Sequence, residues 1–150
     1  FEVLIGNTLL ISAVTGWFVA QVLKTLIHAW VNKGFDPERL IGSGGMPSSH
    51  ASTVCALDVS AGREYGTGSP IFAVTAILAI IVMHDAMGVR LETGKQAKLL
   101  NLIMEQDLFH LDNEHFQKKL KELVGHTPLQ VLAGAILGIL VALLVSTKYF

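Results

Sequence analysis

Four apolar segments alternate with polar stretches along the chain. A helix crosses the hydrocarbon layer of a membrane, about 30 Å thick, with roughly 20 apolar residues, and the first, third and fourth segments approach that length. The second contains Asp58 and many small residues, which favour a helix that lies inside a bundle and is shielded from lipid. The segments cover residues 3–23, 47–62, 70–87 and 128–147.

The polar stretch over residues 88–126 has a helical pattern of its own. Its apolar residues recur at broadly helical spacing between charged ones, which predicts one or two amphipathic helices lying along the membrane surface. These apolar residues are Leu99, Leu102, Ile103, Leu108, Phe109, Leu111, Phe116, Leu120 and Leu123. The whole pattern predicts an all-α integral membrane bundle with about four embedded helices, forming one domain over residues 1–150.

Composition supports this interpretation. Hydrophobic residues make up 51% of the 150 residues and charged residues 15%. The mean hydropathy is +0.54, which is too apolar for an ordinary soluble domain of this length. A net charge of −1 gives no clustered positive charge of the kind that nucleic-acid binding needs. With Cys55 as its single cysteine, the chain cannot form a disulfide within itself.

Lysine and arginine residues are distributed unequally between the two sides of the predicted bundle. Nine follow the first segment or lie between the third and fourth, whereas only Arg63 and Lys148 lie on the other side. Cytoplasmic loops carry the excess of positive charge in membrane proteins. The N-terminus is therefore predicted outside, and the helix ends that carry the candidate site are predicted on the cytoplasmic side.

The sequence GSGGMPSSHAS, residues 42–52, indicates an anion-binding helix start. Pro47 suits the first turn of a helix, and the free amide groups and positive dipole at such a start bind phosphate. His50, in the same turn, is placed to give a proton to a leaving oxygen. Glycine permits close backbone approach and serine adds hydroxyl groups, so the predicted phosphate contacts are Gly44, Gly45, Ser48 and Ser49.

A second helix start follows in GHTPLQVLAGAILG, residues 125–138. Thr127 as N-cap, Pro128 as first helical residue and Gln130 three residues after the cap predict a capping box that holds His126 just outside the helix. Imidazole is a competent nucleophile toward phosphorus. Two histidines on opposite sides of a phosphoryl group can divide attack and leaving-group protonation between them.

Phosphoryl transfer also needs cations to hold the equatorial oxygens. Lys24, Arg39 and Arg90 are the candidates, each of which is otherwise an ordinary basic loop residue. Arg90 lies in HDAMGVRLETGKQA, residues 84–97, where Asp85 and other ionisable groups end an apolar helix. Ionisable groups at membrane depth are costly and usually mark function, although Asp85 and Arg90 can also simply neutralise each other.

Together, GGMPSSHAS, DAMGVRLETGKQA, GHTPLQVLAGAILG and the QVLK that ends at Lys24 closely resemble the divergent branch of the type 2 phosphatidic acid phosphatase and vanadium haloperoxidase superfamily. The resemblance covers residues 21–141. It implies metal-independent hydrolysis of a phosphate ester of a membrane lipid, without a cofactor and through a phosphohistidine. It also implies that His126 is the nucleophile and His50 the general acid.

The chain departs from the family pattern at two positions. Gln130 stands where an Asp usually orients the nucleophilic ring, and Leu120 stands where an Arg usually lies six residues before that histidine. A carboxamide can hold a tautomer but supplies no charge to steady an imidazolium. The resemblance then leaves Arg90 as the expected phosphate clamp, with Asp85 or Glu92 in place of the missing carboxylate.

Two other functions compete with this hypothesis. One is a metal-dependent hydrolase, whose ligand types suit a hard or borderline metal although their spacing does not match a helical zinc site. The ligands of that site would be His84 and Asp85 together with His110, Asp112, Glu114 or His115. The other is a non-catalytic lipid or anion binder, or a transporter subunit. Gly134 and Gly138 allow close helix contact, within the chain or in a homo-oligomer.

Overall fold

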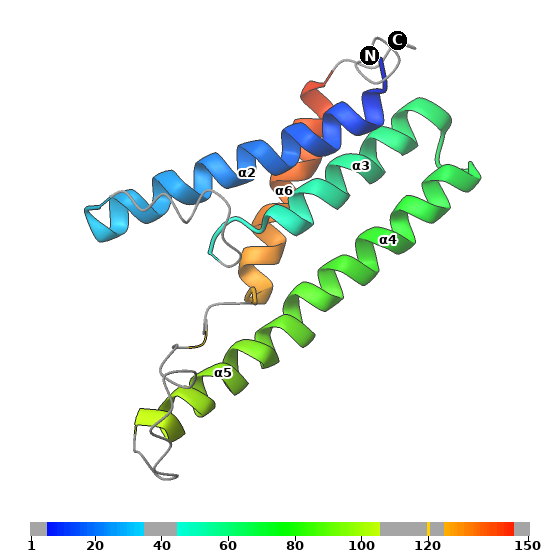
Figure 1. The fold of residues 1–150 in the computed structure, drawn as a ribbon. Coiled ribbons are helices and arrows are strands. Elements are labelled where there is room, and N and C mark those ends of the chain that lie inside the picture. Colours follow the sequence, from blue (N-terminus) through cyan, green and yellow to red (C-terminus); the bar gives the residue numbers. More distant parts are fainter. Residues whose placement is uncertain (1–5, 35–44, 106–119, 121–124, 146–150) are drawn as a thin grey trace.

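The computed structural model describes residues 6–34, 45–105, 120 and 125–145, which form helices and contain no strand (Figure 1). This confirms the predicted all-α class. The helices are α2 (Thr8–Asn32), α3 (Ser49–Tyr65), α4 (Pro70–Met87), α5 (Val89–Glu105) and α6 (Pro128–Leu144).

Helix α3 is the centre of the bundle, because it contacts α2, α4 and α6 (Figure 1). Its small residues make this possible: Ala51, Ala56, Ala61, Ser52 and Ser60 are fully buried. The second apolar segment therefore lies inside the bundle, as its composition predicts. A short helix of low hydropathy is stable there because its neighbours, rather than lipid, cover it.

Glycines let α6 approach α3 at backbone distance. A Cβ atom added at Gly134 would overlap the carbonyl oxygen of Ser48, and one added at Gly138 would overlap that of Ser52. The small residues four apart thus serve a contact within the chain, as in other close helix crossings in membranes.

Some buried polar side chains form hydrogen bonds between helices of the bundle. The Ser52 hydroxyl of α3 donates to the Gly16 carbonyl of α2 at 2.8 Å. The Thr75 hydroxyl of α4 donates to a carboxylate oxygen of Asp58 at 2.8 Å, which gives Asp58 the partner that sequence reasoning did not identify. Such pairing is required where no water reaches the polar group.

Two stretches of the described chain are long and apolar enough to cross a membrane, Thr8–Asn32 and Pro70–Met104, and α6 is a shorter apolar helix. Helix α5 continues α4 in nearly the same direction (Figure 1). It confirms a helix in the first part of the polar stretch, while residues 106–119 and 121–124 lie outside the described residues. That this region lies along the membrane surface stays a prediction.

Candidate active site

The N-termini of α3 and α6 meet at one end of the bundle. The backbone N–H of Ser48 donates to the carbonyl oxygen of Gln130 at 3.0 Å, so the two helix starts are joined directly. Because each N-terminus carries a partial positive charge, their convergence makes this end of the bundle attractive to an anion.

The start of α3 differs from the sequence prediction. Pro47 was expected inside the first turn, but the helix begins at Ser49 with Ser48 as N-cap. The Ser48 side chain accepts from the N–H of Ala51 at 3.4 Å, and this cap sets the first helical residue after the proline. Ser48 and Ser49 are both buried in this turn.

The start of α6 is the predicted capping box. The N–H of Gln130 donates to the Thr127 hydroxyl at 3.4 Å, and the N–H of Thr127 donates to Oε1 of Gln130 at 3.1 Å. This reciprocal pair fixes the backbone immediately after His126. On its other side, the backbone N–H of His126 donates to the carbonyl of Ala86 in α4 at 3.0 Å, so the histidine is held from two elements.

The structure brings the two predicted histidines together. The ring centroids of His50 and His126 lie 5.8 Å apart, with an interplanar angle of 67°. The His126 side chain is only 1% exposed, and His50 is half-buried. Two imidazoles at this separation can both contact one tetrahedral anion of phosphate size, which is the geometry that divided acid and nucleophile roles require.

Gln130 fixes the tautomer of His126. Its Oε1 lies 3.4 Å from Nδ1 of the ring and already accepts from the N–H of Thr127. Because an amide oxygen only accepts, Nδ1 is assigned the proton and Nε2 the lone pair. That Nε2 atom is buried and has no hydrogen-bond partner among the described residues, while the Gly45 backbone lies close enough to the ring to act on its pKa.

The surroundings of His126 keep the ring neutral. Burial lowers the pKa of His126, and the charges of His50 and Lys24 lower it further, against the opposing effects of the Gln130 side chain and the Gly45 backbone. Since the neutral ring is the nucleophilic form, a lowered pKa leaves that form dominant at neutral pH.

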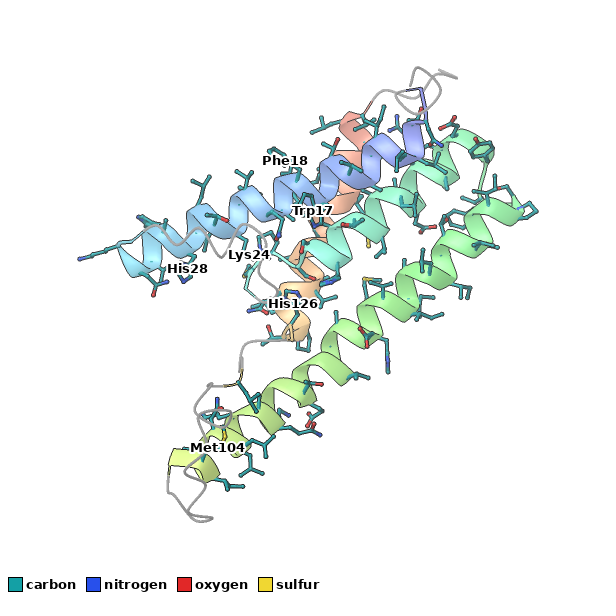
Figure 2. All side chains as sticks on the ribbon, in the orientation of Figure 1. Trp17, Phe18, Lys24, His28, Met104 and His126 are labelled. Atoms are coloured by element: carbon teal, nitrogen blue, oxygen red, sulfur yellow. The ribbon has the colours of Figure 1, made fainter. Side chains whose placement is uncertain are left out.

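Lys24 provides a buried cation beside the histidines. Its side chain extends from α2 and is only 2% exposed, and it lies near His126 at the start of α6 (Figure 2). The stem passes Gly45, where a Cβ atom would lie 3.1 Å from Cδ of Lys24 and where φ is +87°. A side chain at position 45 would therefore both strain the backbone and press on the lysine.

The other predicted site residues are placed less directly. Asp85 is half-buried on α4, next to the residue whose carbonyl holds His126. Arg90 is the second residue of α5, but its side chain, like all of Arg39 and Gly44, lies outside the described residues. Glu92 is bound to Lys95 at 2.7 Å with its side chain 59% exposed, so the contact that the structure gives it is with a lysine of its own helix.

The described residues contain no group of three potential metal-binding side chains. His84 is exposed on α4, whereas His110, Asp112, Glu114 and His115 lie outside the described ranges. The metal-dependent hypothesis therefore gains no support from the residues that the structure places.

Gln130, predicted as a capping-box residue whose carboxamide can hold a tautomer, is the side chain that contacts His126 Nδ1. One further residue was missed by sequence reasoning. Asn101 of α5, which is 3% exposed, binds the backbone of Leu120 twice: its Nδ2 donates to the Leu120 carbonyl and its Oδ1 accepts from the Leu120 N–H, each at 2.9 Å. An asparagine among apolar residues of an amphipathic helix was the available signal.

The fold is that of an all-α membrane protein, and its candidate site lies where two helix N-termini bring two histidines together. The family model described as "Divergent PAP2 family" matches residues 5–141, and the chain belongs to this family. It is 40% identical over 152 residues to the uncharacterized membrane protein YuiD of Bacillus subtilis (strain 168), covering 95% of this chain and 96% of YuiD. No solved structure matches the chain.

Proposed function

We propose that the protein is a membrane lipid-phosphate phosphatase that hydrolyses a lipid phosphomonoester or diphosphate through a phosphohistidine at His126. The observation that carries this proposal is the Nε2 atom of His126, which is buried and has no hydrogen-bond partner in the part of the chain that the structure describes. The centroids of the His50 and His126 rings lie 5.8 Å apart, and buried Lys24 lies beside them. Family membership supports a phosphatase-related protein and leaves the chemistry to be tested.

In the first step the Nε2 lone pair of His126 attacks phosphorus. The N–P bond forms as the ester P–O bond breaks, and the leaving oxygen takes a proton from protonated His50. In the second step water attacks phosphorus, gives a proton to His50, and breaks the N–P bond to release phosphate. His50 gives up a proton in the first step and takes one from water in the second, so the cycle restores both histidines without a cofactor.

Charge on the phosphoryl oxygens is balanced by fixed groups. Lys24 and the N-termini of α3 and α6 supply positive potential that exists before the substrate binds, which is the property that makes such groups effective in transition-state stabilisation. Gly45 and the Ser48 and Ser49 hydroxyls complete the proposed phosphate contacts, with Arg39 and Arg90 as additional cations and Asp85 as a supporting carboxylate.

The site is proposed to face the cytoplasm, because the basic residues concentrate on the side of Lys24. This orientation is tested by labelling single cysteine variants in intact cells with a maleimide that does not cross the membrane. Lys33→Cys, beyond the end of α2, should stay unlabelled, and Gly68→Cys, between α3 and α4, should react; the opposite pattern would reverse the orientation.

Activity is tested by phosphate release from a panel of lipid phosphates in detergent. Wild type should turn over at least one member in the presence of chelator and should be inhibited by vanadate, while His126→Ala and His50→Ala should abolish release. Full activity in both variants would end the proposal. The alternative function is a non-catalytic lipid or anion binder, which stays open because neutral Gln130 supplies no charge to an imidazolium. Binding of lipid phosphate by wild type without turnover would identify it.

A further inference from the structure

Helix α5 has a buried stripe along one face. Gly94, Ala97 and Asn101 are buried, and their spacing of three and four residues puts them on the same side of the helix. The other described side chains of α5 are exposed or half-buried. A buried amide without a hydrogen-bond partner is costly, so the partner of Asn101 indicates what this stripe is for.

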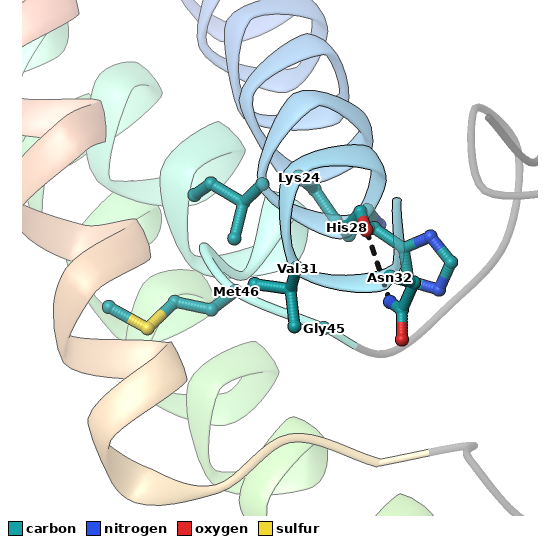
Figure 3. Close-up of a pocket in the computed structure, with 7 residues that line it drawn as sticks. Lys24, His28, Val31, Asn32, Gly45 and Met46 are labelled. Atoms are coloured by element: carbon teal, nitrogen blue, oxygen red, sulfur yellow. Dashed lines mark hydrogen bonds between the residues drawn. The ribbon is translucent and has the colours of Figure 1, made fainter. Parts of the chain in front are cut away.

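Asn101 uses both ends of its amide to hold one backbone position. Its Nδ2 donates to the Leu120 carbonyl and its Oδ1 accepts from the Leu120 N–H, each at 2.9 Å. Asn32 of α2 makes a contrasting contact, in which the amide donates to the His28 carbonyl of its own helix (Figure 3). The reciprocal pair at Asn101 fixes both the position and the direction of a backbone segment 19 residues away, as paired residues of neighbouring strands do.

Leu120 is held by these hydrogen bonds rather than by burial of its own side chain. That side chain is 43% exposed, whereas Asn101 is 3% exposed. Apolar packing therefore contributes little at Leu120, and the amide of Asn101 is the contact that anchors the chain at this point.

The anchored position lies six residues before His126 in the sequence. His126 itself donates its backbone N–H to the carbonyl of Ala86 at 3.0 Å. Ala86 and Asn101 both belong to the long helical stretch Pro70–Met104, so the chain that leads to His126 is attached to that stretch at two points. Because six residues span at most about 20 Å, the anchor at Leu120 limits the directions from which the chain can enter His126.

We propose that Asn101 is a positioning residue for His126: by holding the backbone at Leu120, it keeps the His126 ring buried and beside His50. In this role Asn101 does not react, and it acts through the backbone that it anchors. The inference deepens the proposed function and rests on it for the role of His126 as nucleophile. The positioning itself can be measured without a substrate.

The test is the rate at which diethyl pyrocarbonate modifies His126 in the full chain in detergent at neutral pH, measured by mass spectrometry of the His126 peptide. The wild-type ring is 1% exposed and should react slowly. Asn101→Leu removes both hydrogen bonds and keeps a side chain of similar size. Local opening should become more frequent, and the rate should rise about tenfold, as expected for the loss of two hydrogen bonds.

Gln96→Leu is the matched control, because Gln96 is an exposed amide on the same helix, and its rate should equal that of wild type. Cys55 reports on the rest of the bundle. It is the single cysteine of the chain and is buried in α3, so it should stay unreactive toward a thiol reagent if only the chain around His126 has opened.

Leu120→Pro provides a second variant in case Asn101→Leu exposes Cys55. It removes the N–H that donates to Asn101 and leaves Asn101 itself intact, so His126 should again react faster than in wild type. Equal rates at His126 in folded Asn101→Leu, Leu120→Pro and Gln96→Leu would overturn the proposal.

Phosphate-release kinetics connect the positioning to the proposed reaction. Asn101→Leu should lower kcat roughly tenfold and leave KM within about threefold of wild type, because the proposed phosphate contacts are unchanged; a wild-type kcat in the folded variant would contradict the proposal. If wild type releases no phosphate from any lipid phosphate but Asn101→Leu still speeds modification of His126, the proposed hydrolysis is wrong and the positioning of His126 by Asn101 stands. Failures of the two proposals are therefore distinguishable.

Discussion

Replacing Gln130 by glutamate tests the role of the residue that holds the His126 ring. Glutamate suits the same capping position, so α6 should still begin at Pro128, and the main change is one negative charge about 3.4 Å from Nδ1. At an effective dielectric constant of about 20, such a pair interacts by roughly 5 kcal/mol. Observed shifts from neighbouring opposite charges are smaller, about 1–3 pKa units.

The pKa of His126 should therefore rise by about 1–3 units in Gln130→Glu. Because only the deprotonated ring attacks phosphorus, the acid limb of the pH profile of kcat/KM should move to higher pH by the same amount. Activity at the pH of the wild-type optimum should fall and should recover in more alkaline buffer.

The assay is phosphate release from a lipid phosphate between pH 5 and pH 9, together with a thermal unfolding curve for each variant. Gln130→Met is the matched control, since it keeps the length of the side chain and adds no charge but removes the acceptor. Its activity should fall across the whole pH range without a shifted limb. An unshifted acid limb in a folded Gln130→Glu protein would refute the assignment of Gln130 as the partner of Nδ1.

Three further variants or conditions follow from the same geometry. Gly138→Ala should destabilise the protein by about 1–3 kcal/mol, seen as a lower thermal midpoint, because its Cβ atom would overlap the Ser52 carbonyl; an unchanged midpoint would contradict this packing. Lys24→Met, which keeps the stem but removes the charge, should lower kcat/KM by at least tenfold in phosphate-release assays without loss of folding, and wild-type kinetics would exclude a phosphate contact. Burial lowers the pKa of His126 in the folded protein, so the unfolded chain binds a proton at this histidine more readily. The free energy of unfolding should therefore be highest above about pH 6.5 and decline as the pH falls toward the pKa of the folded state. His126→Gln should show a smaller decline, and equal pH dependence in the two proteins would rule His126 out as its source.

The helices followed from local pattern, because apolar length and capping residues act over a few positions. The capping box at Thr127 and Gln130 is a short-range signal, and it was predicted correctly. The structure begins α3 two residues later than predicted. Pro47 suits the first turn of a helix, but the Ser48 side chain accepts the hydrogen bond that makes Ser48 the N-cap.

The site required contacts that a linear pattern does not contain. Two helix starts and the distribution of basic residues predicted His50 and His126 on the same side of the bundle, and the family resemblance implied their separate roles, since no periodicity relates residues 76 positions apart. The Gln130 oxygen that faces the His126 ring is identified by a backbone contact: the N–H of Thr127 donates to Oε1, and the same Oε1 lies beside Nδ1 of the ring. The burial of Lys24 depends on the absence of a side chain at Gly45, a contact between segments 21 residues apart.

A phosphoryl group trapped on the enzyme tests the central claim most directly. Wild type and His50→Ala would be mixed with a radiolabelled lipid phosphate, quenched rapidly in alkali, digested and mapped. We predict an alkali-stable, acid-labile label on the peptide that contains His126, attached at Nε2. Turnover of the same substrate with no label on His126 at any quench time would contradict the account.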